Sequence, residues 1–174
     1  MQIFKKSIPV NSLISNSFPV INYSDCYYTK FNSPNTIALE DCVRCSLSKR
    51  PKWTMLLMRL RNLLVKPFGL KTGTNNDSTA SVINLSKGNK LSFFEILECN
   101  NEEVLLYASD KHLDGCLSII LRKNNNEYEI YLSTTVKFNN NFGHIYFFLI
   151  KPFHMLIVRA MLYKMANYLN IKNK

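Results

Sequence analysis

The residues best suited to chemistry are two histidines and an aspartate in the second half of the chain: His112, Asp114 and His154. His112 and Asp114 stand two residues apart at the expected start of a strand, so their side chains share one face of it. A His–Asp pair in a pocket could contact a ligand or carry out general acid–base catalysis. The alternative is a structural hydrogen-bond network that ties the strand to the C-terminal helix. We count all three as candidate ligand contacts and assign no catalytic residue.

The cysteines and glycines add little to this chemistry. Cys42 and Cys45 have the spacing of a metal or redox pair, and His112 and Cys116 could add two ligands, but a second well-spaced pair is missing. Two cysteines one turn apart on a half-buried helix face explain the spacing equally well. The five glycines are too dispersed for a GxGxxG motif or a P-loop, and no GxSxG motif occurs. We therefore expect neither a metal site nor a cofactor.

Basic residues give the chain a formal charge of +10, unevenly distributed. Residues 49–71 contain seven lysines and arginines and no acid, and the last carboxylate is Glu129. Such asymmetry can attract nucleic acid, anionic lipid or an anionic ligand, although a solvated basic face explains it too, and we expect no nucleic-acid partner. Arg61, Lys137 and Arg159 come from regions without neighbouring acids and could bind an anionic head group. Alternatively, their apolar stems cover the core.

Length and composition indicate one globular domain. The chain has 174 residues, of which 47% are hydrophobic, enough to bury a proper core. Residues 1–22 lack periodicity and predict an arm that lies on the domain or frays, and residues 23–174 form the domain. The first residues contain no continuous apolar run, so we expect no secretory signal. Five unevenly spaced cysteines fit a reducing cytosol, which predicts a cytoplasmic protein.

Hydrophobic periodicity predicts the element order β-α-α-β-β-β-β-α. The ranges are a strand at 25–31, a helix from the N-cap Thr36 to about Ser48, a helix from Pro51 that Pro67 stops, a polar loop at 72–90, strands at 91–98, 104–109, 113–122 and 128–138, and a helix from Phe142. Trp53 and Arg61 lie eight residues apart in the second helix, so they are roughly in register. Trp53 fits a core anchor or a stacking platform for a ligand.

The final helix is mostly apolar and contains Pro152, which deletes one backbone hydrogen bond and bends the axis. The charge-free run 142–150 is shorter than the roughly 20 apolar residues that a bilayer requires, so we expect a half-buried helix and no transmembrane segment. The stripe expected to face the sheet comprises Phe142, Ile145/Tyr146, Leu149/Ile150, Phe153, Leu156/Ile157, Ala160/Met161 and Met165. A bent helix over a curved sheet leaves room for a cavity.

Several short motifs together resemble a known superfamily. They are Trp53, Arg61-Asn-Leu-Leu-Val, Phe68-Gly-Leu-Lys71, Asp110-Lys-His-Leu-Asp114, Thr134-Thr-Val136, Asn141-Phe-Gly143, Tyr146 and Pro152-Phe-His154. Over roughly residues 23–163, the chain is similar to an uncharacterised bacterial family of the START-like superfamily of helix-grip domains, which includes polyketide cyclases and the birch pollen allergen. Where the family pattern has a Phe-Arg pair after the His-Leu-Asp motif, this chain has Gly115-Cys116. If that arginine normally closes a salt bridge or holds a ligand anion, this member lacks it.

The resemblance implies an α+β helix-grip fold, in which an antiparallel sheet wraps around a long C-terminal helix and encloses an apolar cavity. It implies no reaction, because the superfamily includes lipid carriers, hormone receptors and enzymes. We therefore expect the protein to bind a hydrophobic or amphipathic small molecule, possibly an anionic one, and count Tyr146, Trp53 and Arg61 among the contacts. The alternatives are an acid–base enzyme in the same cavity and a basic module for anionic membrane or nucleic acid.

Overall fold

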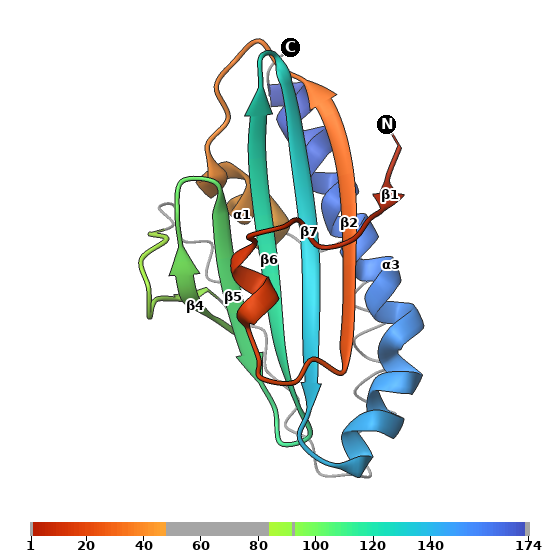
Figure 1. The fold of residues 1–174 in the computed structure, drawn as a ribbon. Helices are drawn as coiled ribbons and strands as arrows, with labels where there is room; N and C mark the ends of the chain where they lie inside the picture. The colour runs from red at the N-terminus through yellow and green to blue at the C-terminus, as the bar shows by residue number, and fades with distance from the viewer. Residues whose placement is uncertain (1, 48–83, 92, 173–174) are drawn as a thin grey trace.

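The computed structural model describes residues 2–47, 84–91 and 93–172. They form one seven-stranded antiparallel sheet with a long C-terminal helix on one face (Figure 1), which confirms the predicted α+β class. The strand order is β1-β2-β7-β6-β5-β4-β3. The elements are β1 Phe4–Lys5, η1 Leu13–Asn16, β2 Tyr23–Asn32, α1 Leu39–Leu47, β3 Lys90–Leu91, β4 Phe94–Cys99, β5 Glu103–Ser109, β6 Leu113–Asn124, β7 Glu127–Phe138 and α3 Asn141–Lys172.

The three longest strands form the centre of the sheet. β6 and β7 make a hairpin whose turn contains Asn125 at a φ of 56°, a left-handed conformation that asparagine tolerates. β2 pairs with β7 over its full length, from Tyr23 opposite Val136 to Asn32 opposite Glu127. The first long strand and the last are therefore neighbours, although most of the chain separates them.

Alternation along the strands gives the sheet two buried faces. Tyr128, Ile130 and Leu132 of β7 point toward α1 and α3 and belong to the main core. Tyr131, between them in sequence, points to the other face and packs with Tyr28 of β2. The segment before β2 crosses this second face, while α1 and α3 lie behind the sheet (Figure 1).

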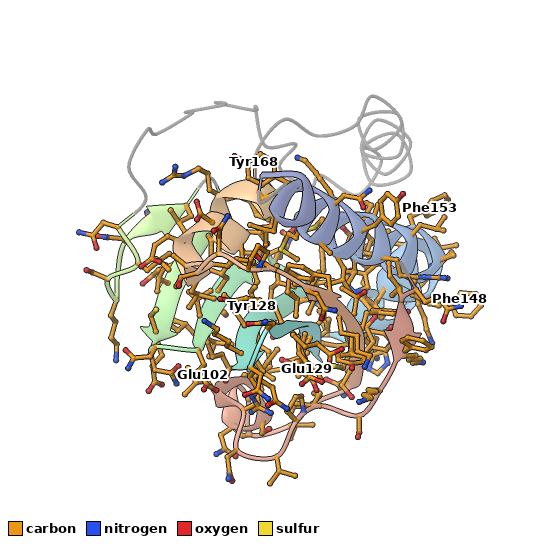
Figure 2. The ribbon with its side chains drawn as sticks, turned by 90° about the horizontal axis from the view of Figure 1, so that it is seen from above. Glu102, Tyr128, Glu129, Phe148, Phe153 and Tyr168 are labelled. Atoms are coloured by element: carbon orange, nitrogen blue, oxygen red, sulfur yellow. The ribbon has the colours of Figure 1, made fainter. Side chains whose placement is uncertain are left out.

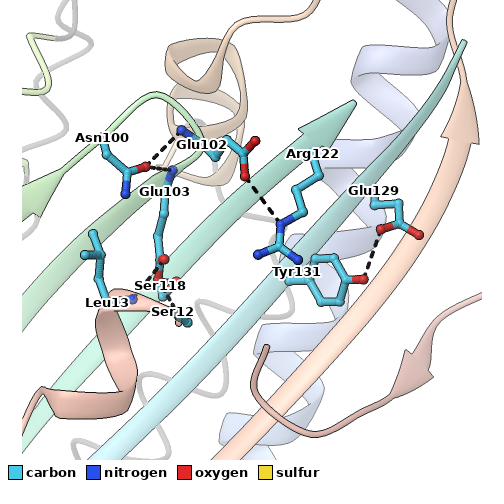
Figure 3. A network of polar contacts seen from close by, with 9 residues as sticks. All are labelled: Ser12, Leu13, Asn100, Glu102, Glu103, Ser118, Arg122, Glu129 and Tyr131. Carbon is cyan, nitrogen blue, oxygen red and sulfur yellow. Dashed lines mark hydrogen bonds and ion pairs between the residues drawn. The ribbon is translucent and has the colours of Figure 1, made fainter. Parts of the chain in front are cut away.

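The N-terminal arm lies on the second face of the sheet. β1 pairs with the edge of β2, and η1 covers Leu105 and Cys116 with the fully buried Ile14. The carboxylate of Glu103 accepts hydrogen bonds from Ser12 Oγ at 2.6 Å and from the Leu13 backbone N–H at 2.9 Å (Figure 3). It also accepts one from the hydroxyl of Ser118. A buried acid thus ties the arm to β5 and β6.

The burial of α3 differs from the predicted stripe. Ile145, Leu149 and Leu156 were expected to face the sheet, but they are 61%, 46% and 53% exposed. Tyr146 and Met165 are buried as predicted, but the helix also packs through Phe147, Val158, Leu162 and Leu169, which the predicted stripe did not contain. The prediction was partly wrong because nearly every position between 145 and 158 is apolar, so periodicity could not select one side. Pro152 lies inside the helix, as predicted.

Two boundaries also differ. α1 begins at Leu39, not after Thr36. The backbone before it is bound by the Tyr128 hydroxyl, which donates to Asn35 O and accepts from the Ile37 N–H, both at 3.2 Å. The strand predicted at 91–98 is divided into β3 and β4. The second helix with Trp53 and Arg61, and the loop as far as residue 83, lie outside the described residues.

Candidate functional site

The sheet separates the site residues predicted from the sequence. Asp114 and Lys137 are paired neighbours on β6 and β7, and their Oδ2 and Nζ atoms are 3.7 Å apart on the face that the arm covers. Asp114 also accepts hydrogen bonds from the hydroxyls of Ser109 and Tyr107. Tyr146 is buried on the helix face with Leu113, Phe142 and Ile150. Asp114 and Lys137 therefore cannot share a pocket with Tyr146.

His112 joins the start of β6 to the start of α3. Its Nδ1 lies 3.1 Å from Asn140 Oδ1, and its ring centre lies 4.6 Å from that of Phe142. A Cβ on Gly143 would come within about 2.3 Å of the His112 carbonyl oxygen, so only glycine allows this close approach. The contacts match the structural network considered for this histidine.

The remaining predicted residues are more scattered. Arg159 is exposed on α3. Trp53 and Arg61 lie outside the described residues, so their assignment as ligand contacts stays a prediction. Among the candidates within the described residues, His154 is the polar one that lies between the sheet and α3, because its Nε2 is 3.4 Å from the buried Oδ2 of Asp25.

Asp25 is the centre of a cluster that the sequence had not suggested. We call Tyr23, Asp25, Thr134 and His154 the polar cluster. Asp25 lies in β2 directly opposite Thr134 of β7, and its side chain is fully buried. Tyr23, two residues earlier and so on the same face, donates its hydroxyl to Asp25 Oδ2 at 2.8 Å. α3 brings His154 to the same oxygen.

Three buried atoms of the polar cluster lack hydrogen-bond partners among the residues that the structure describes. They are Asp25 Oδ1, Thr134 Oγ1 and His154 Nε2. The 3.4 Å separation of His154 and Asp25 is an ion-pair distance, but its geometry is not that of a hydrogen bond. An unpaired buried polar atom costs about 1–3 kcal/mol, so three together call for a physical reason.

Aromatic rings surround these polar atoms. The ring centre of Phe147 lies 4.7 Å from that of Tyr23 and 6.1 Å from that of His154. Phe138 packs against Phe147, with their ring centres 5.4 Å apart. Burial, followed by the hydrogen bond to Asp25, raises the pKa of Tyr23 well above its usual value, so Tyr23 remains a donor at neutral pH. The polar cluster thus offers a buried acceptor, a histidine and a hydroxyl inside an apolar wall.

A sequence signal for Asp25 existed. It is the one acid in the aromatic run Tyr23-Ser-Asp-Cys-Tyr-Tyr28, and strand alternation puts it on the same face as Tyr23 and Tyr27. A carboxylate between two aromatic residues on one face of a strand is expensive to bury without partners. Such a position is a candidate for function.

Four of the five cysteines are buried, Cys99 is half-buried, and none belongs to the polar cluster. All five are free, and Cys42 and Cys45 belong to the main core. Burial raises the pKa of the Cys42 thiol to about 12, which keeps it in its unreactive, protonated form. Among the described residues, no three cysteine, histidine, aspartate or glutamate side chains are grouped as metal ligands.

An open hollow of about 730 Å³ lies at the opposite end of β7, beside α1. Its lining mixes charged Glu40, Glu102 and Lys123 with apolar Leu85 and Leu121. It is a surface depression of mixed polarity, and no residue of the polar cluster lines it.

Comparison with known proteins identifies a family and nothing closer. No curated protein matches the chain. No solved structure matches it either. A family model matches residues 17–161, which include every strand from β2 to β7, the polar cluster and most of α3. The chain therefore belongs to the family described as "Protein of unknown function (DUF2867)".

Proposed function

We propose that this protein binds a hydrophobic or amphipathic small molecule between the sheet and the N-terminal half of α3, with a polar group of the ligand at the polar cluster. The observation that carries the proposal is the set of three buried atoms on Asp25, Thr134 and His154 that have no hydrogen-bond partner among the described residues. A ligand that supplies the missing hydrogen bonds would recover the cost of leaving them unpaired.

The two halves of α3 pack differently, and this difference supports a ligand beneath the N-terminal half. In the C-terminal half, Leu162, Met165 and Leu169 are at most 1% exposed, so the sheet and helix are in close contact there. In the N-terminal half, Ile150 and Phe153 are only partly buried and the His154 side chain is 22% exposed. A small outward movement of this half would open a path to Asp25.

The chemistry of the cluster favours a particular ligand group. Asp25 Oδ1 is an acceptor, so it selects a hydroxyl or an amine on the ligand. The anionic head group expected from Arg61, Lys137 and Arg159 fits less well, because Lys137 pairs with Asp114 on the opposite face of the sheet. We therefore propose a ligand with a neutral or cationic polar group and an apolar body.

The resemblance to the START-like superfamily supports the same proposal. An antiparallel sheet with a long C-terminal helix against one face is compatible with a helix-grip fold. Ligand binding between these two elements is what the resemblance implies.

Five free cysteines fit a protein that works in the reducing cytoplasm.

An acid–base enzyme acting in the same place is the second candidate. It is favoured by the 3.4 Å approach of His154 Nε2 to Asp25 Oδ2, since an aspartate can orient a histidine for proton transfer. Turnover of the bound molecule during incubation would select this candidate over simple binding.

Native mass spectrometry of the full chain purified from its own host tests the proposal. We expect a retained small molecule on the native protein and its loss from Asp25→Asn, with the folded state of the variant checked by circular dichroism. The matched control is Asp114→Asn, the same change on the opposite face of the sheet, which should keep the molecule. No retained molecule in the natural protein, or equal retention in both variants, would contradict the proposal.

A further inference from the structure

The side of α3 that faces away from the sheet carries an exposed apolar stripe. It consists of Ile145, Phe148, Leu149, Pro152, Leu156 and Tyr163, all exposed. These positions recur every three or four residues and so lie on one side of the helix. Figure 2 shows Phe148, which is 76% exposed, projecting away from the sheet. From Ile145 to Tyr163 the stripe runs for about 27 Å.

A stripe of this kind needs a partner. Large exposed apolar patches on proteins mark interaction surfaces, because water solvates them poorly. The helix is long and apolar enough to cross a membrane by length and composition alone, and only 22% of its most apolar stretch is buried. Its other side, however, packs on the sheet through Val158, Leu162 and Met165. The helix in this fold can therefore lie on an apolar phase but cannot cross it.

Charge distinguishes between the partners. The exposed side chain of Arg159 adjoins the stripe, whereas Lys151 turns toward the sheet, with its Nζ 5.1 Å from the centre of the Tyr23 ring. No carboxylate follows Glu129. A second copy of a chain with a net charge of +10 would bring more positive charge and no acid on its own α3. Nucleic acid would pair with the cations but leave Phe148 and Leu156 in water. An anionic bilayer surface matches both features, since it offers phosphate groups above an acyl layer.

We infer that α3 docks in the plane of an anionic lipid bilayer, with Ile145, Phe148 and Leu156 in the acyl boundary and Arg159 at the phosphates. This goes beyond the proposed ligand site, which lies on the opposite side of the same helix. It does not depend on that site, because the lipid would contact the stripe and not the polar cluster.

Co-sedimentation of the full chain with lipid vesicles tests the inference. We expect binding to phosphatidylcholine vesicles that contain phosphatidylglycerol, and much weaker binding to pure phosphatidylcholine. Phe148→Asp should lower the partitioning of the protein onto the vesicles about tenfold or more, because a phenylalanine that enters the bilayer is replaced by a charge. The matched control is Phe93→Asp, the same change at a residue that is 56% exposed between β3 and β4, and it should bind like the natural protein.

A second pair of variants tests the electrostatic part. Arg159→Gln should weaken binding to the anionic vesicles about fivefold, because one cation near an anionic membrane surface contributes about that much to the affinity. Lys87→Gln, at an exposed position in the loop before β3, should not. If Phe148→Asp loses its helical signal by circular dichroism, Phe148→Ser replaces it.

Two results would overturn the inference. One is failure of the natural protein to bind anionic vesicles, or equal binding by Phe148→Asp. The other is a dimer in sedimentation velocity that Phe148→Asp dissociates, which would assign the stripe to a second copy of the chain.

Discussion

Thr134 and Thr135 are adjacent in β7 and differ in the fate of their hydroxyls. Thr134 Oγ1 is buried on the helix face without a partner among the described residues, whereas Thr135 Oγ1 lies 2.7 Å from Ser17 Oγ on the other face. Of two consecutive threonines, one hydroxyl thus lacks a hydrogen-bond partner and the other has one. The contrast provides a direct test of the polar cluster.

Thr134→Val should leave the free energy of unfolding unchanged or raise it by up to about 1 kcal/mol, because it removes an unsatisfied hydroxyl. Thr135→Val should lower it by about 1 kcal/mol, because it removes the hydrogen bond between the Thr135 and Ser17 hydroxyls. Urea denaturation of the ligand-free proteins measures both changes. Equal destabilisation by the two variants would mean that Thr134 has a partner within the protein, which would remove one support for the ligand site.

Glu129 organises two tyrosines on the arm face. Tyr28 and Tyr131 donate their hydroxyls to its two carboxylate oxygens at 3.1 and 3.0 Å. Burial, followed by the hydrogen bond to Glu129 and its negative charge, raises the pKa of Tyr131 from 10.0 to about 12. The pKa of Tyr28 is raised for the same reasons.

Stability should therefore fall in alkali. Below pH 10 both phenols are protonated in the folded and unfolded states. Between about pH 10 and 12 the unfolded chain loses these protons first, so unfolding becomes more favourable as the pH rises. We expect the urea midpoint to decrease across this window, and Tyr131→Phe to reduce the slope. Tyr168→Phe, on an exposed residue of α3, should leave the slope unchanged and serves as the control.

At the scale of elements, Glu103 fastens the arm to the sheet. Its buried carboxylate is the shared acceptor for Ser12 and Leu13 of the arm and for Ser118 of β6. Hydrogen bonds to a charged group contribute more than neutral ones. The short η1 helix has little else to hold it beyond Ile14 and a few partly buried neighbours.

Glu103→Ala should lower the free energy of unfolding by about 2–4 kcal/mol, because it removes the charge-assisted bonds and leaves the buried partners unpaired. Hydrogen exchange should show faster exchange of the amides of residues 12–17 than in the natural protein. Glu98→Ala, at an exposed position of β4, is the matched control and should change neither measurement. A Glu103→Ala protein of natural stability would show that apolar contacts alone hold the arm.

At the scale of elements, both sides of α3 are apolar. One side packs on β2, β7 and α1, and the other presents the exposed apolar stripe. An apolar residue at almost every position is what a helix needs to do both. The same composition made its orientation unreadable from periodicity.

At the scale of the molecule, the sheet is covered twice. α1 and α3 cover one face and the arm covers the other, so both faces of the central strands are buried. This explains why consecutive residues of β6 and β7, 116–121 and 130–136, are buried, where an open antiparallel sheet would bury alternate residues. The predicted site residues are therefore divided between the two faces, with Asp114 and Lys137 on the arm face and Tyr146 and His154 on the helix face.

Local patterns in the sequence determined the strands, the C-terminal helix and the α+β class. Apolar and β-branched residues between Asn-rich turns indicated β5, β6 and β7 to within a few residues, because strand formation and turn conformation depend on near neighbours. The length and apolar character of α3 were equally evident. His154 was also recognised from the sequence as a candidate contact.

Only the tertiary structure decided which residues meet. Antiparallel pairing of β2 with β7 puts Asp25 opposite Thr134, and the packing of α3 then brings His154 to Asp25. Strand register separates Asp114 and Lys137 from Tyr146 by the thickness of the sheet. These are contacts between residues distant in the chain, and pairing register and helix rotation fix them. Neither is encoded in the spacing of a single segment, so the sequence supplied the candidates and the fold selected among them.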